Sequence, residues 1–272
     1  MTQTKEGPQG PIKTGPAKTE AILSARSLTR SFQGFKAVDD LSLDLHQGEI
    51  LGLIGPNGAG KTTMFNMLAG SLLPSSGSIL LNGKDISREG AEKRLKRGLG
   101  RTFQIPRPFP EMTVLENVLC GAQGQSGERA ISAFFRPGKS RQDEARALEK
   151  ARHLTDFLML SHLENEKARV LSGGQRKLLE LARILMADPK VILLDEPAAG
   201  VNPTLLQEIM ARIVTLNEQG VSILLIEHNM DMVARLCSRV MVMALGQKLA
   251  EGAPDAVIRD PEVVRAYLGD AA

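Results

Sequence analysis

The sequence predicts an α/β protein whose mostly parallel core sheet carries an N-terminal antiparallel β subdomain and an inserted helical subdomain. Short apolar runs typical of buried strands alternate with helical segments, which favours a parallel sheet. The stretch from about residue 86 to residue 172 is mostly helical in pattern, so we expect it to be an insertion between two strands of that sheet. The 272 residues are 42% hydrophobic and 24% charged, as in ordinary globular chains.

The N-terminal end is expected to differ from the rest of the chain. Residues 1–20 contain Gly, Pro, Thr and charged residues but no apolar run, so we expect a disordered tail there and not a secretory signal. The folded unit is expected to cover residues 21–272. From residue 21 to residue 45, apolar and polar residues alternate loosely, which predicts two or three antiparallel strands with one face in water.

Further strands and helices are predicted from apolar runs and from the segments between them. The run EILGLIG at residues 49–55 fits a buried strand, and KTTMFNMLAG fits a short helix that Gly70 ends. SILLNG at residues 78–83 predicts another strand. Further along the chain, strands are expected at residues 191–197, 221–228 and 239–246, and a helix at residues 205–217.

Charge, aromatic content and cysteines exclude several classes of function. The formal net charge is +3, with eight Phe, one Tyr and no Trp, so neither a basic footprint nor a stacking platform for nucleic acid is expected. Cys120 and Cys237 have no spacing suited to zinc and are expected to be reduced, as in a cytosolic protein. No apolar run reaches ~18 residues, so we expect no membrane span.

The motif GPNGAGKT, at residues 55–62, predicts the loop of a phosphate-loop NTPase because it follows a buried strand and opens a helix. Its glycines let backbone N–H groups turn towards phosphate oxygens, and the helix N-terminus adds its positive dipole end. Lys61 is expected to contact the β- and γ-phosphates, and the Thr62 hydroxyl to ligate magnesium. The candidate nucleotide-binding residues of this segment are Gly55, Pro56, Asn57, Gly58, Ala59, Gly60, Lys61, Thr62 and Thr63.

A second candidate site is VILLDEP at residues 191–197, a buried strand that ends in two carboxylates. Asp195 is placed to hold magnesium beside the phosphate loop, and Glu196 to accept a proton from an attacking water. A surface Asp-Glu turn is the structural alternative, and the phosphate loop upstream weakens it.

The motif LSGGQ, at residues 171–175, predicts a second phosphate-binding helix start. Ser172 is a suitable N-cap, and Gly173 and Gly174 leave backbone N–H groups uncovered. Taken alone, a capped helix N-terminus is more often structural than functional. Together with Gln175, these residues are candidate nucleotide contacts.

With these three motifs, the sequence resembles the ATP-binding cassette (ABC) family over about residues 22–268. LSGGQ between the two nucleotide motifs distinguishes this family from other phosphate-loop proteins. The resemblance implies that Gln104 reaches metal and water from the helical insertion and that His228 contacts the γ-phosphate. It also implies that Phe32 stacks on adenine, with core packing as the alternative because Phe35 lies close by.

The family resemblance further implies the reaction and the assembly. The cassette is expected to hydrolyse ATP with Mg²⁺, and two cassettes to enclose two ATP molecules head to tail, so that LSGGQ serves the nucleotide on the partner's phosphate loop. The candidate catalytic residues are Glu196, His228 and Gln104, and the candidate metal ligands are Thr62, Gln104 and Asp195. One departure is Asn202, which stands where the family commonly has an aspartate and carries no charge into the dimer contact.

Several segments look like the ATPases of branched-chain amino acid importers, whose close relatives serve urea and short amides. These segments are DEPAAGVNP, RTFQIPRPF, MTVLENV, LLIEHNMDMV and the ending PEVVRAYLGD. The resemblance implies three kinds of partner: membrane permease subunits, a second ABC ATPase subunit that is identical or related, and indirectly a periplasmic binding protein. It also implies a cytoplasmic location, peripheral on the inner face of the cell membrane.

Three other functions stay open at the level of the sequence. Soluble, non-transport ABC ATPases of translation or DNA maintenance usually have two cassettes or a long coiled coil, whereas this sequence shows one cassette and no long heptad run. The ATPase of a lipopolysaccharide exporter is the second alternative. A phosphate-loop kinase is the third, and it leaves LSGGQ unexplained.

The segment IPRPFPEMTVLENV, which follows Gln104, has two apolar clusters broken by prolines. Such a surface suits a groove that receives a short permease helix, with Phe109 and Val114 as contacts. A satellite hydrophobic core is the alternative interpretation.

Overall fold

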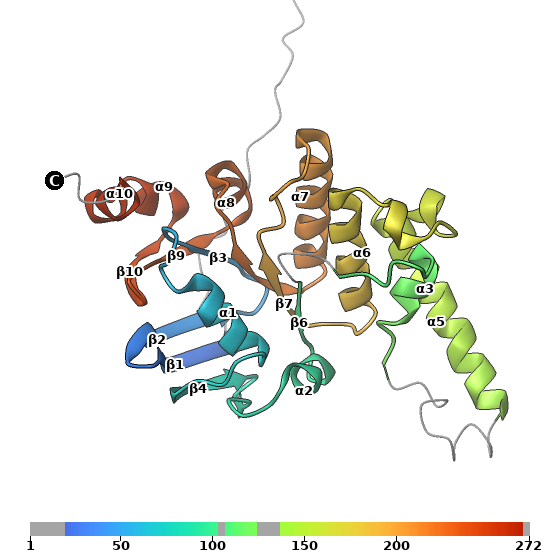
Figure 1. Cartoon of the computed structure of the whole chain (residues 1–272), viewed down its shortest axis with the longest axis horizontal. Coiled ribbons are helices and arrows are strands. Elements are labelled where there is room, and N and C mark those ends of the chain that lie inside the picture. Colours follow the sequence, from blue (N-terminus) through green and yellow to red (C-terminus); the bar gives the residue numbers. More distant parts are fainter. Residues whose placement is uncertain (1–19, 103–106, 124–136, 269–272) are drawn as a thin grey trace, which may run out of the picture.

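The computed structural model describes residues 20–102, 107–123 and 137–268 (Figure 1). The tail expected over residues 1–20 falls almost wholly outside these ranges, and Gln104 falls outside them too. The expectations for both therefore stay predictions.

Four strands near the N-terminus form an antiparallel sheet, and the loose alternation over residues 21–45 predicts the first two of them. They are β1 (Ala21–Phe32), β2 (Phe35–His46), β4 (Ser76–Leu81) and β5 (Lys84–Asp85), in the spatial order β2-β1-β4-β5. In β2, Leu41, Leu43 and Leu45 are buried and alternate with partly exposed residues. One face of this sheet is thus packed on the core, which explains the period of two in the sequence.

Six strands form the core sheet, in the order β10-β9-β3-β8-β7-β6. They are β3 (Ile50–Ile54), β6 (Leu99–Arg101), β7 (Val191–Asp195), β8 (Ser222–Ile226), β9 (Arg239–Ala244) and β10 (Gln247–Gly252). Neighbours are parallel except β9 and β10, which confirms the predicted, mostly parallel sheet. β6 lies inside the stretch 86–172, which is therefore not helical throughout; a strand of three residues is too short to show a period.

The helices group by position. They are α1 (Lys61–Ala69), α2 (Ala91–Lys96), α3 (Val114–Leu119), α5 (Pro137–Phe157), α6 (Gly173–Leu185), α7 (Pro203–Glu218), α8 (Met230–Leu236), α9 (Pro254–Ile258) and α10 (Pro261–Leu268). α3, α5 and α6 contact one another and stand at the end of the molecule away from the antiparallel sheet (Figure 1). No helix in the part of the chain that the structure describes combines the length and apolar character that a bilayer span requires.

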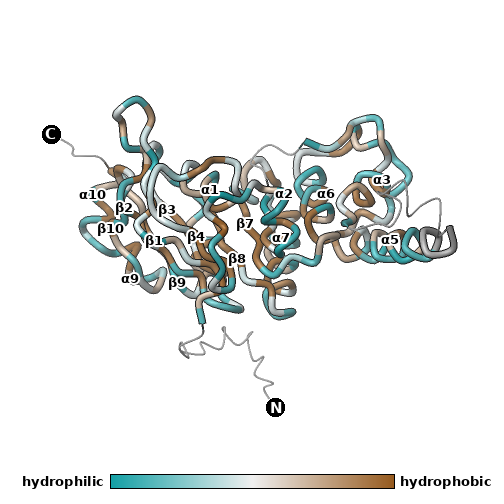
Figure 2. Tube along the Cα trace, turned by 90° about the horizontal axis from the view of Figure 1, so that it is seen from below, coloured by the Kyte–Doolittle hydropathy of each residue, from teal (hydrophilic) through white to brown (hydrophobic). Residues whose placement is uncertain are grey.

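Two hydrophobic clusters bury the core sheet on both faces. In β3, Ile50 and Ile54 belong to one cluster, whereas Leu51 and Leu53 belong to the other. Buried residues of α6, α7 and α8 complete the first cluster, and those of α1 and the antiparallel sheet complete the second. The tube is accordingly brown, or hydrophobic, around β7 and β8 in Figure 2. A strand buried on both faces has a continuous apolar sequence, which is why these strands could be predicted.

The helix that follows the phosphate loop is held at its far end by a buried arginine. Arg94 of α2 is fully buried and donates hydrogen bonds to the carbonyl oxygens of Met67 and Leu68, both at 2.6 Å, and of Ile86, at 2.8 Å. Burial lowers the pKa of Arg94 to about 10, which leaves it protonated at neutral pH. Its positive charge lies at the carboxyl end of α1, where the helix dipole favours it.

Candidate nucleotide-binding and hydrolysis site

The phosphate loop links β3 to α1, and two of its positions require glycine. Gly55 and Gly60 have φ angles of 150° and 95°, a backbone conformation that other residues rarely adopt. A Cβ atom on Gly55 would overlap the carbonyl oxygen of Met243, and one on Gly60 would overlap that of Ala37. Strands β9 and β2 therefore press against the loop and determine its path.

Lys61, the first residue of α1, closes the phosphate loop on itself. Its ammonium group donates to the carbonyl oxygens of Gly55, at 2.7 Å, and Pro56, at 2.9 Å, and the residue is 6% exposed. Burial lowers the pKa of Lys61, while the nearby carboxylates of Glu196 and Asp195 raise it. A cation held at a helix N-terminus in this way is arranged to meet an anionic phosphate group.

Asp195 ends β7 and is held by a network that the sequence analysis did not identify. Arg101 of β6 donates to the Asp195 carboxylate at 2.9 Å and to the side-chain oxygen of Asn66, in α1, at 2.6 Å. The backbone N–H of Asp195 donates to the Thr102 hydroxyl at 3.1 Å. Burial raises the pKa of Asp195, and the bond from Arg101 opposes this effect. Arg101 therefore connects this carboxylate to the helix of the phosphate loop.

Glu196 and His228 meet at the carboxyl edge of the core sheet. Glu196 Oε1 lies 3.2 Å from His228 Nε2, and the two side chains are 20% and 42% exposed. The backbone of Glu196 is left-handed, with φ at 47°, and its N–H donates to the carbonyl oxygen of Ile226 at 2.9 Å. Because β7 and β8 are adjacent and parallel, their carboxyl ends bring together two residues that are far apart in the sequence.

The LSGGQ motif opens α6 with a capping box, so the predicted N-cap at Ser172 is confirmed. The Ser172 hydroxyl accepts from the Gln175 N–H at 3.3 Å, and the Ser172 N–H donates to Gln175 Oε1 at 2.9 Å. Gly174 lies against Leu205, where a Cβ atom would overlap that side chain, whereas Ser172 and Gly173 are exposed. α6 and α1 stand on opposite sides of β6 and β7 (Figure 1), so the two phosphate-binding motifs of one chain are separated.

Phe32 ends β1 and lies outside the core, which removes core packing as its explanation. It is 43% exposed, and Phe35, across the hairpin turn, is 69% exposed. The guanidinium of Arg30 covers one face of the Phe32 ring, at 4.7 Å from its centre, and donates to the carbonyl oxygen of Leu73 at 2.9 Å. Cation–π contacts of this kind favour one ring orientation.

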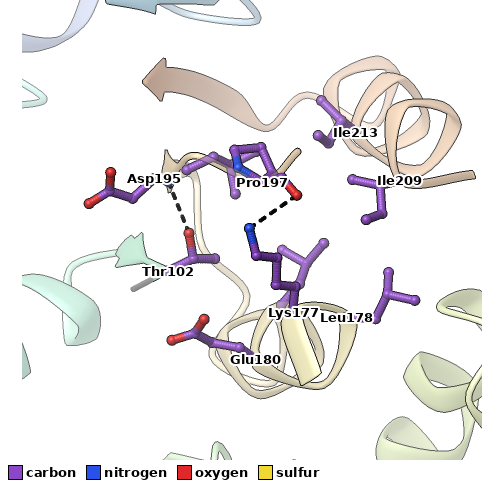
Figure 3. A pocket seen from close by; sticks show the side chains of 10 residues that line it. Thr102, Lys177, Leu178, Glu180, Asp195, Pro197, Ile209 and Ile213 are labelled. Carbon is purple, nitrogen blue, oxygen red and sulfur yellow. Dashed lines mark hydrogen bonds between the residues drawn. The ribbon is translucent and has the colours of Figure 1, made fainter. Parts of the chain in front are cut away.

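A pocket beside Asp195 opens between β7, α6 and α7 (Figure 3). Within it, Lys177 of α6 donates to the carbonyl oxygens of Glu196, at 2.5 Å, and Pro197, at 3.4 Å. Burial lowers the pKa of Lys177, and neighbouring carboxylates, Glu227 first among them, raise it. Lys177 thus ties the LSGGQ helix to the end of the strand that carries Asp195, a link that no sequence motif indicates.

The oxygen donors at this edge of the sheet fit a magnesium ion. Asp195 provides a buried carboxylate, and Thr62, which follows Lys61 in α1, has an exposed hydroxyl. Mg²⁺ prefers oxygen ligands and is usually held by one or two protein oxygens together with substrate phosphates. Gln104, the third candidate ligand, lies outside the described residues.

Comparison with known families explains why these motifs occur together. Residues 38–199, which contain the phosphate loop, LSGGQ and Glu196, match the family model described as ABC transporter. The chain belongs to the ABC transporter family. As a member it is an ATP hydrolase whose cassette binds nucleotide, as the sequence predicts. Residues 247–272 of the cassette match a second family model, described as branched-chain amino acid ATP-binding cassette transporter.

Curated relatives resemble this cassette over nearly their whole length. The probable branched-chain amino acid transport ATP-binding protein LivG of Archaeoglobus fulgidus is 41% identical, over 91% of this chain and 95% of its own. The high-affinity branched-chain amino acid transport ATP-binding protein LivG of Escherichia coli is 38% identical, over 93% of this chain and 100% of its own. The corresponding BraF of Pseudomonas aeruginosa is also 38% identical, over 92% and 98%.

Solved structures share the fold of the cassette. A nucleotide-free ATP-binding cassette from an ABC transporter has a TM-score of 0.81 at 38% identity, covering 92% of this chain and all of its own. The ADP conformation of the cassette MJ1267 has a TM-score of 0.79 at 38% identity, covering 93% of this chain and all of its own. The fold class and the family predicted from the sequence are thereby confirmed.

Proposed function

We propose that this cassette is the ATP-binding and ATP-hydrolysing subunit of an ABC importer for branched-chain amino acids or for a related amino acid or amide. The match of residues 247–272 to the branched-chain amino acid cassette family is the observation that carries the proposal. Relatives named for branched-chain amino acid transport, which are covered over 95% to 100% of their length, support it. The same observations disfavour a lipopolysaccharide exporter, a soluble non-transport ATPase and a kinase.

ATP binding would involve both sheets. Adenine would stack on Phe32, on the ring face that Arg30 does not cover. Lys61 would exchange its bonds to the carbonyl groups of its own loop for bonds to the β- and γ-phosphates, while the N–H groups at the start of α1 donate to the same phosphates. Thr62 and Asp195 are the described residues that would hold Mg²⁺, which when bound neutralises charge on the β- and γ-phosphates.

Hydrolysis would require a base close to the γ-phosphate. Glu196 is the candidate, because its carboxylate lies at the open edge of the sheet, one residue beyond Asp195. There it can take a proton from water that attacks the γ-phosphate. His228, within hydrogen-bond distance of Glu196, would orient that carboxylate and contact the γ-phosphate. Gln104 would orient the water from the helical part of the chain.

The complete site would be shared between two cassettes. The separation of α6 from α1 within one chain supports this arrangement, as does the exposure of Ser172 and Gly173, because both leave the LSGGQ helix start open to a second nucleotide. Asn202, at the departure from the common family pattern, accepts the Leu205 N–H at 2.9 Å and caps α7. Its amide therefore stabilises a helix start and adds no charge to the contact between cassettes.

In the cell, the cassette would work at the inner face of the membrane, bound to permease subunits. The second cassette would be identical or related, and a periplasmic binding protein would deliver the transported molecule indirectly, through the permeases. The names of the relatives, each a transport ATP-binding protein, support this assembly.

Reconstitution tests the proposal. The cassette is purified with the permeases and binding protein encoded beside it and placed in liposomes, where ATP-dependent uptake of labelled leucine is measured with urea and short amides as competitors. We expect ATP-dependent uptake of leucine or of one of the competing compounds. Failure to purify with any permease, or export of a lipid-linked saccharide by the complex, would contradict the proposal.

A further inference from the structure

The geometry points to Glu227 as a positioning residue of the hydrolytic site, one whose carboxylate joins the loop after β7 to the loop after β8 and so holds Glu196 and His228 together. This inference rests on the catalytic roles proposed above for those two residues. Glu227 lies in the segment LLIEHNMDMV, directly before His228, but is not one of the candidate site residues that the sequence predicts.

Glu227 is a buried acid that accepts three hydrogen bonds from backbone N–H groups. It is 3% exposed. Its Oε1 accepts the N–H of Ala198 at 2.6 Å, and its Oε2 accepts the N–H groups of His228, at 2.9 Å, and Asn229, at 3.0 Å. Hydrogen bonds to an ionised acceptor are roughly twice as strong as those between neutral groups. One side chain thus fixes three peptide groups from two loops.

These bonds lie where the sheet itself no longer joins the two loops. The parallel ladder of β7 and β8 ends with Asp195 beside Ile226. Beyond it, the Glu196 N–H still donates to the Ile226 carbonyl at 2.9 Å. Glu227 directly follows β8, and Ala198 lies three residues beyond the end of β7, so the Glu227 carboxylate continues the connection past the edge of the sheet.

The residues held in this way are not fixed by packing. The side chains of Glu196 and His228 are 20% and 42% exposed, yet their functional atoms lie 3.2 Å apart. Glu196 also has a left-handed backbone, and such conformations persist in residues other than glycine only when the surroundings over-determine them. The Glu196 peptide groups bond to Ile226 and Lys177, and the bond from Ala198 to Glu227 fixes the backbone that follows.

The charge of Glu227 also connects these loops to the LSGGQ helix. Lys177 of α6 donates to the Glu196 carbonyl, in the same turn, at 2.5 Å. Burial lowers the pKa of Lys177, and among the carboxylates that raise it Glu227 has the largest effect. Lys177 and Glu227 thus both hold the turn after β7, the first through the Glu196 carbonyl and the second through the Ala198 N–H.

Two variants separate a positioning role from a merely structural one. Glu227→Ala removes all three acceptors, whereas Glu227→Gln keeps the length of the side chain and one acceptor oxygen, so it can serve one loop but not both. We expect kcat for ATP to fall by about 10- to 100-fold in Glu227→Ala, because small displacements of reacting groups have effects of this size. KM should change by less than about threefold, and Glu227→Gln should have an intermediate kcat.

Glu49 provides a matched control at the opposite edge of the sheet. Its side chain is 10% exposed and accepts from the Arg239 guanidinium at 2.8 and 2.9 Å and from the His46 N–H at 2.8 Å. Glu49→Ala should lower the Tm by an amount similar to that in Glu227→Ala while leaving kcat near its normal value. A loss of kcat in Glu227→Ala but not in Glu49→Ala, with a similar fall in Tm in both, would support the positioning role.

The outcomes also separate this inference from the proposed catalytic roles. Near-normal turnover in Glu196→Gln would overturn the role of Glu196 as the base. An inactive Glu196→Gln together with an unchanged kcat in Glu227→Ala would overturn only the positioning role of Glu227. If Glu227→Ala does not fold, Glu227→Gln decides the question: a normal kcat in that variant contradicts the inference, and a lowered kcat with an unchanged KM supports it.

Discussion

Lys61 is bound to two carbonyl oxygens of its own phosphate loop, and we propose that this cation binds the nucleotide phosphates. Lys61→Ala removes this charge, so we expect ATP affinity in a calorimetric titration to fall by about 100-fold, the size of one or two charged hydrogen bonds. Lys150→Ala is the control, because Lys150 lies in α5 and pairs with Asp188. An unchanged affinity in Lys61→Ala would refute the assignment of this residue.

Single residues differ in how far the sequence reveals them. Local motifs were enough to predict Lys61, Asp195 and Glu196 as site residues, because each stands in a short pattern of a strand, a turn and a few polar residues. Arg101 and Glu227 act between segments that are distant in the chain. Arg101 joins β6 to β7 and α1, and Glu227 joins two loops, so their roles depend on tertiary contacts that one sequence does not reveal.

At the scale of elements, the two docking candidates near the start of α3, Phe109 and Val114, differ in burial. Val114, expected as a docking contact, is fully buried in the hydrophobic cluster that covers one face of the core sheet, so this residue packs in the core and is no surface contact. Phe109 is 48% exposed, and the Arg183 guanidinium covers its ring at 5.1 Å. Its backbone is fixed by Asn117, whose side chain both accepts the Phe109 N–H and donates to its carbonyl. Phe109 is therefore a rigidly held, exposed aromatic ring.

We expect Phe109→Asp to uncouple transport from hydrolysis, because the change adds a charge at the surface proposed to dock a permease helix and leaves the nucleotide site alone. ATP-driven uptake in liposomes should fall by at least tenfold while the ATPase activity of the isolated cassette stays within about twofold. Val114→Asp is the comparison, and it should instead lower the Tm because it buries a charge. A parallel loss of uptake and basal hydrolysis in Phe109→Asp would rule out the docking role.

The elements themselves could be predicted where burial imposes a pattern. β3, β7 and β8 are buried on both faces and stood out as apolar runs. β6, with three residues, and β10, an edge strand with exposed residues, were not predicted, because neither is long enough or buried enough to show a pattern. The capping box at Ser172 was partly visible, since the hydroxyl and Gln175 lie three residues apart in the sequence.

At the scale of the whole molecule, the separation of LSGGQ from the phosphate loop predicts sites shared between two chains. Ser172→Arg and Lys61→Ala should each be inactive alone, because each change damages both sites of a symmetric dimer. Mixing the two proteins should restore roughly a quarter of normal hydrolysis, because half of the dimers then contain one intact site. If the partner cassette is a related chain, Ser172→Arg is made in this chain and the change that corresponds to Lys61→Ala is made in the partner. Full activity of Ser172→Arg alone would remove LSGGQ from the mechanism.

We expect Glu196 to act as the base of a site that two cassettes close, and Glu196→Gln tests this role. The change keeps the size of the side chain and removes its basicity, so turnover should fall by ~10²–10⁴-fold. ATP binding should survive, because Lys61, Thr62 and Asp195 are untouched. Gel filtration with ATP and Mg²⁺, with the partner chain added if there is one, should show a stable dimer that the unchanged protein forms only transiently. Near-normal turnover with no stable dimer would contradict the claim and assign catalysis to His228.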